Sequence, residues 1–159
     1  MSPSRPLREA LKHRFYPFAQ QQGFIRGKAT SLFVPFERVV DGKVQFFEIQ
    51  WDKSHRPRFV VNFGERVGLE HNEGEPLPAQ GRLQRWRGSS IHSWFQLGKP
   101  WFEKLRTWRW HHQPDEVAMQ LVECFPELET WWSSRQAGPH VQLWLRANKQ
   151  NIPPHHKTP

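Results

Sequence analysis

Apolar and polar residues alternate through the stretch from Val44 to Gly64, which therefore predicts the central strand pair of the protein. A repeat of every second residue is what a strand needs when one face of its sheet is buried. A basic, proline-containing connection separates the two halves of the stretch. The alternating apolar positions are Phe47, Ile49, Trp51, Phe59, Val61 and Phe63.

The alternation changes phase between Phe46 and Phe47, so that these neighbouring rings point to opposite faces. Two explanations are open: a β-bulge between them, or a strand with both faces partly covered. The face opposite Ile49 and Trp51 carries polar side chains. If they are uncovered, this is the first place to look for a bound partner. They are Gln45, Glu48, Gln50 and Asp52.

Further elements are expected on both sides of this pair. A helix from Leu7 should end or kink near Tyr16, because Pro17 cannot continue it without losing a hydrogen bond, and one more turn over 20–22 could follow before Gly23. A strand over 30–40 precedes Asp41-Gly42, a dipeptide typical of a two-residue hairpin turn. A short strand is expected over 83–86.

The second half of the chain predicts helices. Pro100 suits the start of one in which Trp101, Leu105 and Trp108 recur at helical spacing, and Gln113-Pro114 suits the start of another. Segment 141–145 is open between a strand and a helical turn. The expected fold is α+β: an antiparallel sheet of about four strands, with an N-terminal helix and C-terminal helices packed on one face. Residues 1–6 are expected to be a flexible arm, 7–147 a single domain and 148–159 a disordered tail.

Composition adds a preference for an anionic partner. The formal net charge is +8, from 23 Lys and Arg against 15 Asp and Glu, which favours nucleic acid, acidic protein or lipid headgroups. Cys124 is the single cysteine, so no intrachain disulfide forms, and a reducing cytoplasm is the expected compartment. No apolar run is long enough for a signal peptide or a membrane span, so we expect no membrane association.

Several short motifs follow one another in an order known from one bacterial family. The predicted first helix ends at Gly23-Phe24, a strand reads FVVNFG from Phe59 to Gly64, and Arg82-Leu83 precedes a Trp-rich stretch. The chain in this respect resembles the bacterial domain of unknown function 4304 family, moderately over about its first hundred residues and weakly beyond them. The resemblance implies a small α+β domain and brings neither a shared activity nor catalytic residues. Pro35 and the Pro-rich tail depart from the family pattern.

Arginine and tryptophan are interleaved in two segments that form the first candidate site. Arginine binds phosphate or carboxylate through two parallel hydrogen bonds, and exposed aromatic rings stack on bases, as in a single-stranded nucleic-acid groove. The alternative is that Trp86, Trp108 and Trp110 are core anchors and the arginines a solvated face. The candidate binding residues are Arg82, Arg85, Trp86, Arg87, Arg106, Arg109 and Trp110.

Motifs for metal binding or catalysis are weak. The nine histidines include the adjacent pairs His111-His112 and His155-His156, but neighbouring residues point in different directions, so no metal or other cofactor is expected. Cys124 lies on the apolar stripe of a predicted helix, where a thiol is unreactive. Glu48, Asp52 and His55 form the one acid–base group that an enzyme would use, and a solvated face is the other interpretation.

Three functions remain in order of preference. The first is a non-enzymatic, intracellular binding module for another protein, of the immunity or antitoxin type, with a toxin as one candidate partner. The segment from Gly64 to Gly81 and the Arg-Trp surface would be its recognition elements. The second is nucleic-acid binding through the basic residues. The third is a hydrolase of unknown type. The oligomeric state is left open.

Overall fold

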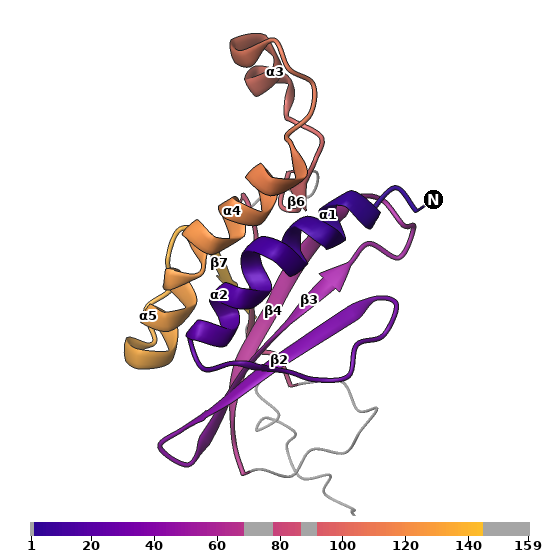
Figure 1. Ribbon diagram of the computed structural model, residues 1–159. Coiled ribbons are helices and arrows are strands. Elements are labelled where there is room, and N and C mark those ends of the chain that lie inside the picture. The colour runs from indigo at the N-terminus through magenta and orange to yellow at the C-terminus, as the bar shows by residue number, and fades with distance from the viewer. Residues whose placement is uncertain (1, 69–77, 87–91, 145–159) are drawn as a thin grey trace, which may run out of the picture.

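The computed structural model describes residues 2–68, 78–86 and 92–144, and it shows helices packed against a twisted antiparallel sheet (Figure 1). The helices are α1 (Arg5–Ala10), a π-helical turn η1 (Leu11–Phe15), α2 (Tyr16–Gln21), α3 (Trp101–Thr107), α4 (Pro114–Cys124) and α5 (Pro126–Ser134). The strands are β1 (Ile25–Arg26), β2 (Phe33–Val40), β3 (Lys43–Trp51), β4 (Arg58–Val67), β5 (Gly81–Leu83), β6 (Phe95–Gln96) and β7 (Val141–Leu143).

The sheet is larger than expected. Among the described residues it has seven strands in the order β1-β2-β3-β4-β5-β7, with β6 paired to one end of β4, so the expectation of about four strands was wrong. The additional strands β1, β6 and β7 have only two or three residues each. Segments this short show no repeat of polar and apolar residues, and their pairing partners identify them instead. The α+β class itself holds.

The hairpin of β3 and β4 has no bulge. Its register runs without interruption from Lys43 opposite Val67 to Trp51 opposite Phe59. Phe46 and Phe47 are nevertheless both fully buried, on opposite faces. Phe46 is accommodated by Gly64, where an added Cβ would come within 2.7 Å of the ring. The change of phase therefore reflects a strand covered on both faces, the second of the two explanations.

Local turn chemistry behaves as the sequence indicates. Asp41 and Gly42 join β2 to β3 with φ angles of 50° and 74°, the positive values that a two-residue hairpin turn of the primed type requires. Gly23, with φ of 89°, follows α2 and redirects the chain toward β1. These positions are confirmed as turns.

The N-terminal helix continues past Tyr16 into a further turn, one of the alternatives that the sequence left open. It begins at Arg5, inside the segment 1–6, and continues through α2 to Gln21. Pro17 has no N–H to donate, and the turn before it widens so that the Tyr16 N–H bonds the Leu11 carbonyl. The π-helical turn thus lets the helix pass the proline.

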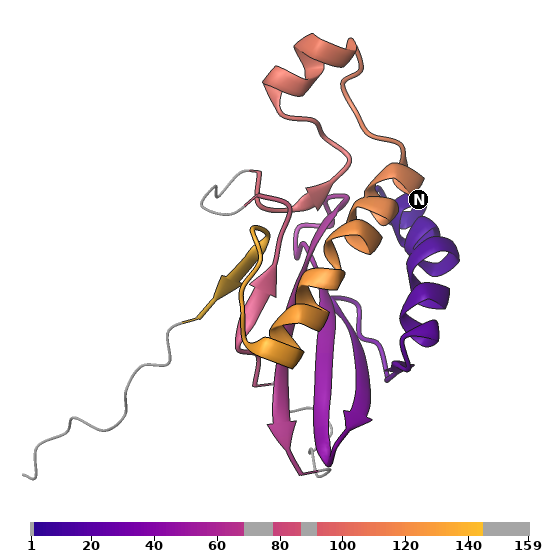
Figure 2. The same ribbon diagram turned by 90° about the vertical axis from the view of Figure 1, so that its left-hand side faces the viewer.

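Helices cover one face of the sheet and build the core there. In Figures 1 and 2, α1, α2 and α4 run across the same side of β3 and β4. Phe47 lies at the centre of this layer, with its ring 4.8 Å from Phe36, 4.9 Å from Phe24 and 5.2 Å from Phe125 between centroids. A few aromatic side chains therefore supply much of the buried apolar surface, as the composition suggested.

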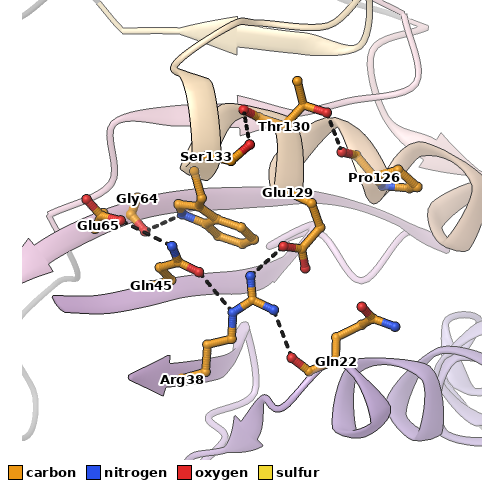
Figure 3. A network of polar contacts seen from close by, with 10 residues as sticks. Gln22, Arg38, Gln45, Gly64, Glu65, Pro126, Glu129, Thr130 and Ser133 are labelled. Carbon is orange, nitrogen blue, oxygen red and sulfur yellow. Dashed lines mark hydrogen bonds and ion pairs between the residues drawn. The ribbon is translucent and has the colours of Figure 1, made fainter. Parts of the chain in front are cut away.

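A half-buried arginine, Arg38, ties α5 to the β2–β3 hairpin, as Figure 3 shows. Arg38 on β2 donates to Gln45 Oε1 at 2.9 Å, to the Gln22 carbonyl at 2.8 Å and to Glu129 Oε2 at 2.5 Å. Beside it, Trp132 on α5 donates through Nε1 to the Gly64 carbonyl at 3.0 Å. Because these bonds connect the N-terminal, sheet and C-terminal parts, they hold the body together as one unit.

Candidate functional site

The most conspicuous surface feature is a projection of the chain that carries α3. It leaves the body beyond β6 and returns to it at α4, and both views show α3 standing at one end of the molecule (Figures 1 and 2). A single β-bridge between Gly98 and His111 closes its base. We refer to residues 98–111 as the arm.

The arm exposes its apolar side chains. Trp101, Leu105 and Trp108 recur at helical spacing as expected, and they are 70%, 66% and 88% exposed. Trp110 and Phe102 are also exposed, so the interpretation of Trp108 and Trp110 as core anchors was wrong. Contiguous exposed apolar surface of this kind typically marks an interaction site.

Contacts within the arm hold it in shape. The buried Lys99 donates through Nζ to Thr107 Oγ1 at 2.9 Å, and its N–H donates to the Trp110 carbonyl at 3.1 Å. Helix α3 starts after Pro100 and ends at Thr107, and the next residue, Trp108, caps it with a left-handed φ of 53°. The polar contacts leave the indole of Trp108 at the surface. The arm therefore presents its aromatic rings on a defined backbone.

The exposed charges of the arm are mainly positive. The Lys104 ammonium lies 4.8 Å from the Trp110 ring centroid, and Arg106 is exposed. The acidic residue of α3, Glu103, is turned toward the body, where its Oε2 lies 3.2 Å from His112 Nε2. An aromatic surface bordered by cations is thus what the arm offers to a partner.

Two residues of the sequence-predicted site lie at the foot of the arm. The Arg85 guanidinium lies 4.9 Å from the Trp86 ring centroid. Trp86 in turn meets the ring of Phe102 edge-on, at 6.4 Å between centroids. Arg85, Trp86, Arg106, Arg109 and Trp110 are therefore on or beside one projection.

Arg82 lies elsewhere. It is on the face of the sheet opposite the helices, where Nε donates to Asn62 Oδ1 at 2.9 Å and Nη2 to Gln50 Oε1 at 3.2 Å. Its guanidinium lies 5.7 Å from the Trp144 ring centroid. Arg87 lies outside the described residues. The expected arginine–tryptophan constellation is thus divided between two surfaces.

Glu48 belongs to the same polar network as Arg82. Its Oε1 accepts a hydrogen bond of 3.2 Å from Asn62 Nδ2. Burial raises the pKa of Glu48, more than the Asn62 hydrogen bond and the positive charge of Arg82 lower it. The strand face with Glu48 and Gln50 therefore holds an internally bonded polar cluster.

Asp52 is a structural carboxylate at the end of β3. Its Oδ2 lies 2.5 Å from Arg58 Nε, and its Oδ1 accepts the Ser54 N–H at 2.6 Å. Burial by itself would raise the pKa of Asp52, but these two partners together hold it below its usual range. His55 is an exposed loop residue with φ of 61°. Within the described part of the chain, no hydrogen bond or ion pair joins Glu48, Asp52 and His55, so they do not form the convergent group that the third hypothesis requires.

Replacing Asp52 with asparagine should lower stability in a pH-dependent manner. A carboxyl group whose pKa is depressed by folding contributes stability above its unfolded pKa, and this contribution is lost as the pH falls through the folded pKa. We therefore expect Asp52→Asn to be less stable than wild type at neutral pH, with a difference that shrinks below about pH 4. Urea unfolding across this pH range measures the difference.

Asp115→Asn is the matched control, because the Asp115 side chain is 58% exposed in its ion pair with Arg14. Its stability should follow wild type within about 1 kcal/mol at every pH. A gap between Asp52→Asn and wild type that is constant with pH would contradict the assigned role of the carboxylate.

The described residues form no recognisable nucleophile, metal site or membrane span. Burial raises the pKa of the Cys124 thiol to about 11, so this side chain is not an activated nucleophile. No three His, Cys, Asp or Glu side chains among the described residues come close enough to hold a metal ion. No helix in the described ranges is long and apolar enough to cross a membrane.

The chain was compared with family models, curated proteins and solved structures. No family model, curated protein or solved structure matches the chain. The resemblance to the domain of unknown function 4304 family stays a prediction. The arm must therefore be interpreted from its own residues.

Proposed function

We propose that the protein is a non-enzymatic binding module that docks onto another protein through the arm. The observation that carries this proposal is the exposure of Trp101, Leu105 and Trp108 on a projection held in shape by its own polar contacts. Tryptophan is enriched among the residues that dominate the binding energy of protein interfaces. Such residues typically fill well-packed pockets near the centre of the interface. An exposed tryptophan cluster fits such a role.

The arrangement on α3 favours docking of a helix into a groove. Trp101 and Leu105 are one turn apart and lie on one side of the helix, with Phe102 next to them. Apolar side chains at this spacing are how short helices fill an apolar groove of a partner. Since Leu105 cannot stack on bases as an aromatic ring does, its exposure supports a protein partner over nucleic acid.

Charge narrows the chemistry of the partner. Lys104 and Arg106 flank the apolar side of α3, and the chain as a whole carries a net charge of +8. A partner groove rimmed by carboxylates would be attracted to this surface and oriented on it. An immunity-type or antitoxin-type role in the cytoplasm, with the arm inserted into a toxin, is the specific form of this proposal. Arg82 lies on a different surface from the other arginines. The proposal of a single basic nucleic-acid-binding surface is therefore less well supported than that of a protein partner.

Site-specific crosslinking in the native host tests the proposal. With the photoreactive residue benzoylphenylalanine at position 105, we expect covalent adducts with protein. The substitution Trp108→Ala in the same chain should reduce these adducts at least about tenfold, the loss typical of an interface hot spot. Its stability should stay within about 0.5 kcal/mol of wild type, because the indole is exposed.

The matched control places the same photoreactive residue at Val39, which is 60% exposed. Val39 lies near the tip of the β2–β3 hairpin, at the other end of the molecule from α3 (Figure 1). Adducts of equal yield from both positions, or no adduct from position 105, would refute the proposal.

A further inference from the structure

We infer that one partner of the arm is a second copy of this chain, whose groove between η1 and α4 receives the apolar side of α3. This inference rests on the proposed function and specifies its partner. It joins two features of the same surface that have opposite chemistry: the cationic aromatic arm and an acidic groove. The contact is reciprocal, so that each copy gives its arm and receives the arm of the other.

The groove has room for side chains of the arm. It is a shallow, solvent-open groove with a volume of about 590 Å³, and it lies between Arg14 on η1 and one side of α4. The α4 side contributes Asp115, Glu116, Met119 and Glu123. Met119 is 42% exposed and gives the groove an apolar element, since its flexible thioether adapts to aromatic rings.

The carboxylates of the groove are accessible to new partners. Asp115 and Glu123 are exposed, and the Asp115 ion pair with Arg14 joins two side chains that are each more than half exposed. Glu116 is less free, because its Oε2 accepts the Gln113 N–H at 2.7 Å. Asp115 and Glu123 are therefore the anions that Lys104 and Arg106 of another copy would meet.

The position of the groove allows a closed dimer. His112, the first residue after the arm, also lines the groove. The groove therefore begins where the arm rejoins the body. When one arm enters the groove of the second copy, the second arm is brought to the groove of the first. A two-fold axis between the two arms satisfies both contacts at once, and the assembly closes without further growth.

The expected contact is large enough to be stable. The exposed aromatic and aliphatic side chains of two arms together offer on the order of 1,000 Å² of apolar surface, close to the size of specific interfaces. The net charge of +8 on each copy opposes association. At physiological salt the screening length is about 8 Å, so repulsion between the bodies is weak while direct arm–groove contacts persist.

Charge reversal combined with mixing tests this inference. In the arm-reversed chain, Lys104→Glu is combined with Arg106→Glu. In the groove-reversed chain, Asp115→Lys is combined with Glu123→Lys. All four side chains are at least partly exposed, so both chains should fold, which circular dichroism checks. Light scattering coupled to size-exclusion chromatography then gives the mass of each chain between about 1 and about 100 µM.

Wild type should reach twice the 19.0 kDa mass of one chain, and each reversed chain alone should stay at the single mass. An equimolar mixture of the two reversed chains should restore the doubled mass, because each negative arm then meets a positive groove and each positive arm a negative groove. Trp108→Ala, which leaves all charges in place, should also stay at the single mass.

Other outcomes overturn the inference. Wild type of single mass at every concentration would do so, as would a dimer that survives both reversals or reversed chains that fail to pair on mixing. The proposed function fails separately, when position 105 gives no protein adduct of any kind. Adducts of other masses from a monomeric chain would leave the proposed function standing and remove the second copy as partner.

Discussion

Replacing Phe47 with alanine should lower the free energy of unfolding by about 3–5 kcal/mol, the usual range for removing a fully buried ring. Phe47 is completely buried, and its ring stacks on Phe36 and meets Phe15, Phe24 and Phe125. The cavity left by the substitution would remove contacts with the N-terminal helix, the segment before β1, strand β2 and the junction of α4 and α5 together. Urea denaturation followed by tryptophan fluorescence or circular dichroism measures the change.

Phe102→Ala is the matched control for this substitution. Its ring is 45% exposed and lies on the arm, so the expected loss is below about 1 kcal/mol. Equal losses for the two variants would mean that the arm is part of the core and would contradict its description as a projection. A small loss for Phe47→Ala would mean that the aromatic layer does not hold the domain together.

Arg38→Ala should cost about 2–4 kcal/mol, somewhat less than the cost of breaking a fully buried ion pair, because the Glu129 side chain is 34% exposed. The substitution removes three hydrogen bonds and the packing of the guanidinium over Phe24. Glu129 Oε1 is buried without a hydrogen-bond partner among the described residues, so the carboxylate depends on Arg38 for its compensation. Thermal unfolding should show the loss as a lower midpoint.

Arg14→Ala provides the control, because it removes the same kind of side chain from an ion pair. Arg14 and Asp115 are 55% and 58% exposed, and exposed pairs contribute less than about 1 kcal/mol. If Arg38→Ala were no more harmful than Arg14→Ala, the network in Figure 3 would not be a structural tie. Arg14 also borders the acidic groove, so this variant should not weaken self-association.

The two sets of variants separate stability from recognition. Phe47 and Arg38 lie in the body, where their loss destabilises the fold. Trp108 lies on the arm, just after α3, where its loss should leave the fold intact and abolish partner binding. The packed body thus supports the arm, and the arm presents apolar side chains that do not contribute to the core.

The sequence by itself determined the elements whose information is local. Alternation from Phe47 to Trp51 identified a half-buried strand, because a pleated chain puts every second side chain on one face. The Asp41-Gly42 turn followed from the positive φ angles that few residues tolerate. The start of α4 followed from Pro114 and the acidic residues after it, which favour a helix N-terminus.

Only the tertiary structure decided where those elements face. Trp101, Leu105 and Trp108 have the spacing of a buried helical stripe, and spacing describes the helix rather than what lies beside it. No part of the described body reaches that side of α3, so the same stripe is a surface. In the same way, only pairing partners reveal β6 and decide that 141–143 is a strand, and only the contacts of their side chains show that Arg82 and Arg85 belong to different surfaces. Local pattern depends on backbone geometry, whereas burial depends on residues far away in the chain, and the candidate site is defined by the absence of such neighbours around α3 in the described structure.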